Sequence, residues 1–176
     1  MAPTEKIVFI TSATFGGNLG GRAGADQKCQ DAADNTTVPL SGTYRAWISD
    51  ASGSPNGDVT FTKSTDPYVL VNGNPIADSY ADLTATNIGV ILDNAITVDE
   101  NGNPSAATLA WTATAYTGDS RFIFANPALD SCNNWTSNTA GLTFAWTGAP
   151  TLTSFQWTEG GQAGCNLLIP IYCFQQ

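Results

Sequence analysis

The chain holds four cysteines and no CxxC pair. Zinc sites built from four cysteines usually use close pairs, and only Cys165 and Cys173 stand near each other here. We therefore favour two disulfides, which form and persist in oxidising compartments. Four cysteines allow three pairings, and the spacing of Cys29, Cys132, Cys165 and Cys173 does not choose among them.

Composition excludes several classes of function. The 176 residues carry 6 basic and 15 acidic side chains, a formal net charge of −9, so neither nucleic acid nor an anionic membrane is an expected partner. Histidine is absent, which removes Ser-His-Asp and Cys-His nucleophile pairs and His-ligated zinc. No run approaches the roughly 20 apolar residues of a membrane span, so we expect no membrane insertion.

Length and termini suggest how the chain is organised. Its length favours one domain, residues 1–176. The stretch Met1–Lys6 lacks the apolar region of a signal peptide, although disulfides indicate secretion. We therefore expect the C-terminal piece of a longer secreted protein.

Local patterns predict an α+β domain with few helices. The β-branched and aromatic run Lys6–Ser12 predicts a buried strand, and Arg22–Ala33 predicts the main helix. That helix would place Ala25, Cys29 and Ala32 on one inner face. Further elements are predicted as strands at Thr43–Ser49, Pro67–Val71 and Leu167–Phe174, a hairpin turn at Asn72-Gly73 and a short helix at Ile76–Leu83 with Ile76, Tyr80 and Leu83 inward. Pro170 lacks an N–H, which predicts an edge strand or a bulge.

Several motifs follow one another in a specific order. They are the turn and helix of Gly17–Ala33, the strand Gly42–Trp47 (GTYRAW), the segment Pro67–Val69, the string Cys132–Thr136 (CNNWT), and Cys165 followed by Tyr172–Phe174 (YCF). This series resembles endostatin, the C-terminal module of collagens XV and XVIII. It is still closer to bacterial endostatin-like surface domains. The resemblance spans Lys6 to Phe174 and is weakest over Thr84–Ser131.

The resemblance implies a C-type-lectin-like fold, with a small twisted, mainly antiparallel β core, one main helix, a second short helix and long loops. It also implies nested disulfides, Cys29–Cys173 and Cys132–Cys165, and a role in binding matrix components or host proteins. Endostatin binds zinc through histidines and heparin through an arginine patch. Since this chain has no histidine and only Arg22, Arg45 and Arg121 as arginines, we expect neither activity.

Trp157 is the aromatic residue singled out as a contact residue. It lies in the polar stretch Ser154–Gly164, so we predict an exposed ring that stacks on a sugar or anchors a protein partner. Gln156, Glu159 and Asp119 are the polar residues predicted to act with it. For Trp111, Trp135 and Trp146, core packing is the favoured interpretation.

The sequence Asp99–Asn103 is the densest cluster of side-chain oxygens. Hard cations prefer such ligands, which makes calcium the one cofactor to consider, at Asp99, Glu100, Asn101 and Asn103. The cluster is too short for an EF-hand, and a solvated Asn-Gly turn is the favoured alternative. Asp119 and Asp130 could complete such a site.

These observations favour a binding module over an enzyme. Twelve of the 15 carboxylates belong to Asp, often in turn contexts, which makes a two-carboxylate glycosidase the least favoured reading. We expect an extracellular or bacterial cell-surface adhesion module for a glycan or protein ligand, with Thr84–Ser131 and Gly148–Gly164 as adaptable loops. The alternative is the terminal knob of a trimeric surface fibre, joined through a region that precedes Met1.

Overall fold

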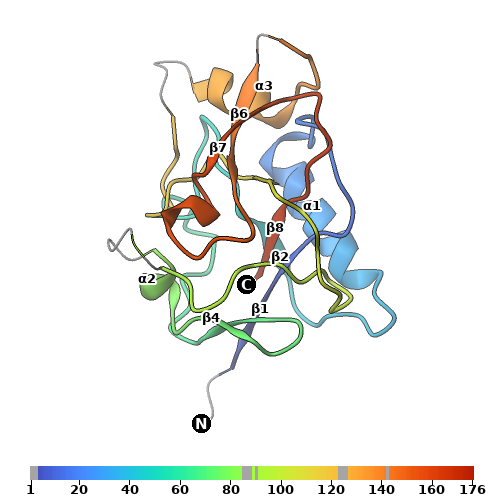
Figure 1. Cartoon of the computed structure of the whole chain (residues 1–176), viewed down its shortest axis with the longest axis vertical. Helices are drawn as coiled ribbons and strands as arrows, with labels where there is room; N and C mark the ends of the chain where they lie inside the picture. Colours follow the sequence, from blue (N-terminus) through green and yellow to red (C-terminus); the bar gives the residue numbers. More distant parts are fainter. Residues whose placement is uncertain (1–3, 85–88, 90, 123–126, 142) are drawn as a thin grey trace.

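The computed structural model describes residues 4–84, 89, 91–122, 127–141 and 143–176, which fold around two β-sheets (Figure 1). The five-stranded sheet has the order β2-β8-β1-β3-β4 and the three-stranded sheet the order β5-β6-β7. Among these strand pairs only β1 and β3 run parallel. The strands are β1 (Lys6–Ile10), β2 (Tyr44–Ala46), β3 (Tyr68–Leu70), β4 (Pro75–Ala77), β5 (Ala110–Trp111), β6 (Phe144–Gly148), β7 (Gly161–Gly164) and β8 (Tyr172–Gln175). The predicted α+β class with a mainly antiparallel core is confirmed.

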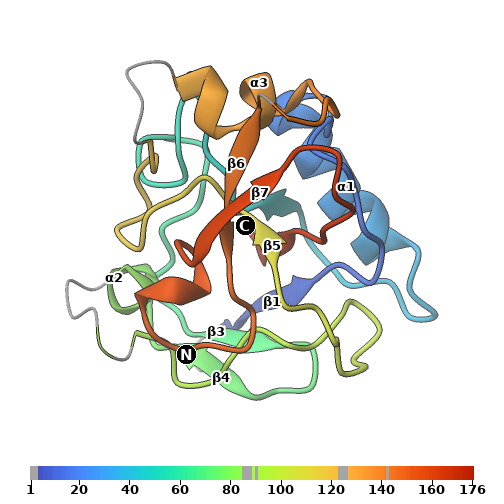
Figure 2. The same ribbon diagram turned by 45° about the horizontal axis from the view of Figure 1, so that its top comes forward.

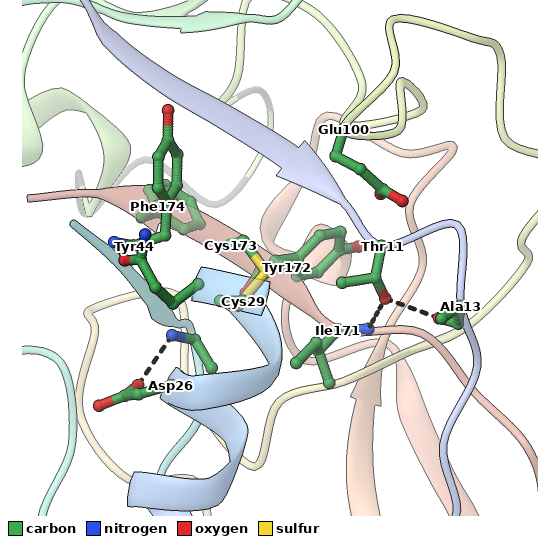
Figure 3. The surroundings of a disulfide bond; sticks show 12 residues. Thr11, Ala13, Asp26, Cys29, Tyr44, Glu100, Ile171, Tyr172, Cys173 and Phe174 are labelled. Carbon is green, nitrogen blue, oxygen red and sulfur yellow. Dashed lines mark hydrogen bonds between the residues drawn. A yellow bond between two sulfur atoms is a disulfide. The ribbon is translucent and has the colours of Figure 1, made fainter. Parts of the chain in front are cut away.

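The main helix is α1 (Gly21–Asp34), as the sequence predicted. Its buried face carries Ala25, Cys29 and Ala33, spaced four residues apart, whereas Ala32 is only partly buried. Cys29 is bonded to Cys173 of β8, which ties the helix to the middle of the large sheet (Figure 3). Figure 2 shows α1 on one side of the molecule and α2 (Tyr80–Leu83) on the opposite side.

The predicted helix Ile76–Leu83 is wrong in its first half. Strand β4 takes up Ile76, because the chain turns at Asn72-Gly73 and pairs back along β3. The helix begins only after Ser79, whose hydroxyl oxygen accepts the N–H of Asp82 and caps the first turn. The side chains of Ile76, Tyr80 and Leu83 are nevertheless all buried.

The prediction of an edge strand or bulge at Pro170 is also wrong. Strand β8 lies between β1 and β2, in the interior of the sheet. Pro170 precedes the strand, where its missing N–H removes no ladder bond, and its carbonyl accepts the N–H of Trp111 at 3.0 Å. Leu167 and Leu168, at the start of the predicted strand, are 46% and 71% exposed instead of buried.

The large sheet separates two hydrophobic clusters. Since successive side chains of a strand point to opposite faces, Tyr172 and Phe174 enter one cluster and Cys173 the other. In the first cluster the ring of Trp47 lies 5.2 Å from that of Trp157 and 5.2 Å from that of Phe174, measured between centroids. The second cluster contains all four half-cystines. The structure joins Cys29 to Cys173 and Cys132 to Cys165, the pairing that the resemblance implied.

The turn α3 (Cys132–Trp135) is left-handed, with φ between 50° and 61° at its four residues. Asparagine tolerates this conformation, but cysteine and tryptophan rarely adopt it. Tertiary contacts hold the turn: the Cys132–Cys165 disulfide at one end, and at the other a hydrogen bond of 2.8 Å from Trp135 Nε1 to the Ser49 carbonyl. The described residues also form two short 3₁₀ turns, η1 (Pro127–Asp130) and η2 (Phe155–Trp157).

Asp58 links α1, β2 and the loop between β2 and β3. Its Oδ2 lies 2.9 Å from a guanidinium nitrogen of Arg22 and 3.2 Å from one of Arg45. Partial burial alone would raise the pKa of Asp58, but hydrogen bonds from Thr60 and the two guanidinium charges outweigh it and hold this pKa well below its ordinary value. Two of the three arginines are therefore engaged in holding the scaffold together.

Candidate functional site

Trp157 is not an exposed contact residue, so that prediction is wrong. Its side chain is fully buried, against the rings of Trp47 and Tyr172. The Tyr172 hydroxyl donates to the Trp157 carbonyl at 2.8 Å, and a Cβ at Gly148 would stand 1.9 Å from that oxygen, so the backbone there is enclosed too. Thr158, a polar neighbour that suggested exposure, is itself buried and bonded within the core.

Of the three polar residues predicted with Trp157, Asp119 lies in the turn at residues 114–120 and Glu159 bonds to it. Asp119 is exposed and accepts hydrogen bonds from Asn56 and Thr117. Glu159 accepts the N–H of Tyr116 at 3.2 Å and pairs with Arg121 at 3.4 Å. Gln156 is exposed. These side chains form internal bonds and line none of the three hollows described below.

The turn Asp99–Asn103 is a hydrogen-bonded loop between the bridge partners Val98 and Pro104. The Oδ1 atom of Asp99 accepts the N–H groups of Asn101 and Asn103, both at 2.9 Å. Across residues 4–84, 89, 91–122, 127–141 and 143–176, no group of three His, Cys, Asp or Glu side chains could hold a metal ion. Calcium binding at Asp99, Glu100, Asn101 and Asn103 therefore stays a prediction, and the described residues provide no preformed carboxylate cluster for it.

Glu100 is the residue of this turn that faces inward. Its side chain is only 7% exposed. One carboxylate oxygen accepts the Ser12 N–H at 2.8 Å and the other accepts the Ser12 hydroxyl, so Glu100 fastens the turn to the segment that follows β1. Figure 3 shows Glu100 beside the end of β1, close to Thr11 and Ala13.

A hollow of about 390 Å³, which we name the Glu100 cleft, lies between the segment after β1, the second half of α1 and this turn. Its volume falls within the range of small-ligand sites. An adjoining hollow of about 350 Å³, the apolar annex, shares Glu100 and Asn101 and is bordered by Val38, Leu40 and Val71. The polar and aromatic lining of the Glu100 cleft comes from Phe15, Lys28, Asp31, Asn35, Glu100 and Asn101.

The polar groups of the Glu100 cleft are only partly used within the chain. The Asp31 Oδ1 atom accepts the Gln27 amide at 2.7 Å, and Asn35 donates its amide to the Asp31 carbonyl at 2.6 Å. The ammonium of Lys28 lies 5.3 Å from the Phe15 ring centroid, and in the described part of the chain it has no carboxylate within ion-pair distance. Oxygen acceptors therefore outnumber donors in the cleft.

Sequence reasoning singled out Glu100 and Asn101 but missed the residues that α1 and the segment after β1 contribute. The signal that pointed inward was present, because Ile96, Val98 and Glu100 alternate with period two. All three are buried, with exposed fractions of 0%, 6% and 7%. Phe15 and Lys28 carry no such pattern, since their proximity to Glu100 depends on chain folding.

A second, uncharged hollow of about 490 Å³ lies on the other side of the segment after β1. Its lining combines hydroxyl groups of Thr11, Ser12 and Ser105 with the exposed side chains of Leu167 and Leu168. We name it the leucine groove. Within the described ranges, Leu167 and Leu168 are the only two large apolar residues that are adjacent in sequence and both exposed.

The described helices include none with the length and apolar character that a membrane crossing requires.

No curated protein matches the sequence. A family described as "Protein of unknown function (DUF1554)" matches residues 12–153, a stretch that includes α1, the Asp99–Asn103 turn and all the lining residues of the Glu100 cleft. Because this match covers more than half of the chain, the protein belongs to the DUF1554 family.

Proposed function

We propose that this chain is an extracellular recognition module that mediates adhesion by binding a ligand of another cell or of the extracellular matrix in the Glu100 cleft. The observation that carries the proposal is the convergence in one hollow of partly unused polar groups from α1 and from the Asp99–Asn103 turn, beside the Phe15 ring of the segment after β1. Such a hollow, with a few placed polar groups, is the usual form of a binding site.

The scaffold supports a binding role outside the cytoplasm. Two disulfides join α1 and α3 to the end of the chain, and disulfides of this kind persist in oxidising compartments. We infer that the domain is endostatin-like with a C-type-lectin-like fold, because its nested disulfide pairs are those of that family. With a net charge of −9, and with Arg22 and Arg45 bound to Asp58, we expect neither heparin nor nucleic acid as the ligand.

Binding is favoured over catalysis by the state of the carboxylates in the cleft. Both oxygens of Glu100 accept hydrogen bonds from Ser12, so this residue is engaged in structure. Asp31 lies on the exposed surface of α1 and bonds to Gln27. Neither arrangement supplies the acid and nucleophile that glycoside hydrolysis needs.

The test is adhesion of the purified, disulfide-bonded domain to fixed cells and to immobilised matrix. The double variant Asp31→Ala, Asn101→Ala removes two lining side chains. Its matched control is Asp34→Ala, Asn103→Ala. Asp34 accepts Gln30 at 2.9 Å just as Asp31 accepts Gln27, and Asn103 lies in the same turn as Asn101, but neither control residue lines the cleft.

Adhesion of the wild-type domain and of the control, with loss in the cleft variant, is the expected result. Equal adhesion of both double variants would show that the cleft is not the contact site. Absence of adhesion by the wild-type domain on every surface would contradict the proposed function itself.

The leucine groove favours one alternative function, the terminal knob of a fibre. Exposed leucines beside an uncharged hollow suit contact between copies, because like-charged subunits repel least where neither carries charge. Light scattering over a concentration series would detect a trimer, and Leu168→Asp would dissociate it. Val59→Asp is the control, since Val59 is 95% exposed and lies away from the groove. A monomer at all concentrations would count against an autonomous knob.

A further inference from the structure

The side chains that line the Glu100 cleft favour one class of ligand over others. The inference about that ligand rests on the proposed function. We propose that the cleft binds an uncharged carbohydrate, with hydroxyl groups toward Asp31, Asn35 and Asn101 and an apolar C–H face toward the annex. Three features carry this assignment: the count of charges, the surplus of oxygen acceptors, and the apolar wall beside them.

The charges disfavour an anionic ligand. One ammonium, from Lys28, stands against two carboxylates, from Asp31 and Glu100, which leaves a net charge of −1 on the lining. The whole chain carries −9. A sulfate or a carboxylate group in the cleft would lie near both acidic side chains, and like charges at such a distance disfavour binding.

A lysine or arginine side chain of a protein partner would have to compete with the Lys28 ammonium, which already lies in the cleft. Such a cation would seek the carboxylates or the face of an aromatic ring. The Phe15 ring already has the Lys28 ammonium 5.3 Å from its centroid, so the protein's own cation occupies that position. Glu100 offers little attraction, because it is 7% exposed and its oxygens already accept two hydrogen bonds from Ser12.

The unused hydrogen-bonding groups match hydroxyls. Asp31 Oδ2 takes part in no described hydrogen bond, and the amide oxygens of Asn35 and Asn101 are likewise free within the described residues, because both amides bond through their NH₂ groups. These oxygens need donors. The free donors beside them are the Lys28 ammonium and the second N–H of each of these two amides, and these donors need acceptors. A hydroxyl group satisfies both kinds of partner, since it donates one hydrogen and accepts through two lone pairs.

The apolar annex completes the match. Val38, which is 78% exposed, stands with Leu40 and Val71 directly beside Glu100 and Asn101. A sugar ring combines a polar edge of hydroxyls with a face of C–H groups, so it can meet the cleft and the annex at once. A hydrocarbon ligand would remove water from the polar groups of the cleft without replacing their hydrogen bonds, which is unfavourable.

The experiment applies the intact, disulfide-bonded domain to an array of immobilised neutral oligosaccharides with sialylated and sulfated counterparts. We expect binding to one or more neutral glycans and at least tenfold weaker binding to the charged counterparts. Asp31→Ala should weaken that binding at least tenfold, whereas Asp34→Ala should leave it unchanged. Asn101→Ala and Asn103→Ala repeat this comparison on the turn, and far-ultraviolet circular dichroism verifies that each variant is folded.

Three outcomes overturn the carbohydrate assignment: strongest binding to sulfated or sialylated glycans, binding insensitive to both Asp31→Ala and Asn101→Ala, or no glycan binding at all. The adhesion assay separates the last outcome from failure of the proposed function. If the domain adheres equally to cells before and after enzymatic deglycosylation, and the cleft variants still abolish adhesion, the cleft binds protein and only the carbohydrate assignment fails.

Discussion

The turn that carries Glu100 and the 3₁₀ turn that carries Trp157 both bury a side chain by more than nine-tenths, but they do so through different interactions. Trp157 is enclosed by aromatic rings on the inner side of the large sheet. Glu100 is enclosed by hydrogen bonds to Ser12, next to an open hollow. The first arrangement contributes stability by excluding water, and the second holds a polar turn in place at the rim of a candidate site. Residues of equal burial therefore have different expected consequences when changed.

The largest effect is expected from removing a support that both turns share. The Cys29–Cys173 disulfide has a sequence separation of 144 and ties α1 to β8. Tyr172 of β8 bonds to Trp157, and β8 pairs with β1, the strand that leads to Ser12. In the loop-entropy model, Cys29→Ala with Cys173→Ala lowers the free energy of unfolding by about 5 kcal/mol. The Cys132–Cys165 disulfide closes a shorter loop, with a sequence separation of 33, so Cys132→Ala with Cys165→Ala should lower the free energy of unfolding by about 4 kcal/mol. Denaturant unfolding followed by tryptophan fluorescence compares the two, and the reverse order would contradict this account.

Trp157→Ala tests the aromatic side of the comparison. Removal of a fully buried indole leaves a cavity among Trp47, Tyr172 and Phe174, which should lower the free energy of unfolding by about 4 kcal/mol. Trp157→Phe is the control, because it retains a ring and should lower the stability by less. A stable Trp157→Ala variant with impaired adhesion would mean that Trp157 is a contact residue after all.

Asp99→Ala tests the hydrogen-bonded side. Its Oδ1 atom accepts two backbone N–H groups of a turn in which Asp99 is 8% exposed, so the variant leaves both without this partner. We expect the free energy of unfolding to fall by about 2 kcal/mol. Asn103→Ala, at an exposed position of the same turn, should change it by less than about 0.5 kcal/mol. Equal effects of the two variants in thermal unfolding would show that the Asp99 carboxylate does not hold the turn.

Acid should weaken the scaffold at Asp58, away from both turns. The folded-state pKa of Asp58 lies below its unfolded value, so its contribution is complete above the ordinary carboxyl pKa of about 4 and is lost as the pH falls below it. At neutral pH, Asp58→Asn should lower the free energy of unfolding by about 1 kcal/mol, a figure reduced for partial exposure. Urea unfolding at pH 7 and pH 3 measures the difference between wild type and variant. A difference that grows on acidification would have the wrong sign.

Glu100→Gln should have the smallest effect on stability, about 0.5 kcal/mol. The amide carbonyl can accept the Ser12 N–H, and the amide NH₂ can donate to the Ser12 hydroxyl, so both bonds survive in a neutral form. Glu100→Ala removes both and should cost about 1–2 kcal/mol more. If Glu100→Gln unfolded as readily as Trp157→Ala, the charge itself would hold the turn, and the distinction between the two turns would disappear.

Much of the fold could be predicted from local patterns. The run of β-branched and aromatic residues predicts β1, and the helical spacing of small apolar residues predicts α1. The turn at Asn72-Gly73 was found because glycine supports its φ of 85°. The helix predicted at Ile76–Leu83 failed in its first half because strand pairing overrode a pattern that both structures could satisfy.

The candidate site was far less predictable. Asp99–Asn103 was singled out for its oxygens, and two of its residues do line the cleft, but as partners of α1 and of the segment after β1. Nothing in the local sequence indicates that Phe15, Lys28 and Glu100 meet. The prediction that Trp157 is exposed is wrong because polar neighbours in sequence need not lie at the surface. The Thr158 hydroxyl, for example, is buried, where it accepts a hydrogen bond from Trp47 and donates one to the Thr114 carbonyl.

By itself the sequence determined the pattern of short strands around one main helix, because hydrophobic period and turn residues act over a few positions. It also determined the net charge of −9, which disfavours polyanionic partners, and the absence of histidine, which excludes His-dependent catalysis and His-ligated zinc however the chain folds. Only the tertiary structure decided that Trp157 is core, that β8 is central and that Glu100 opens onto a cleft. These properties depend on contacts between residues up to 170 positions apart, such as the hydrogen bond of Lys6 to Gln176, and such contacts leave no periodic trace in the chain.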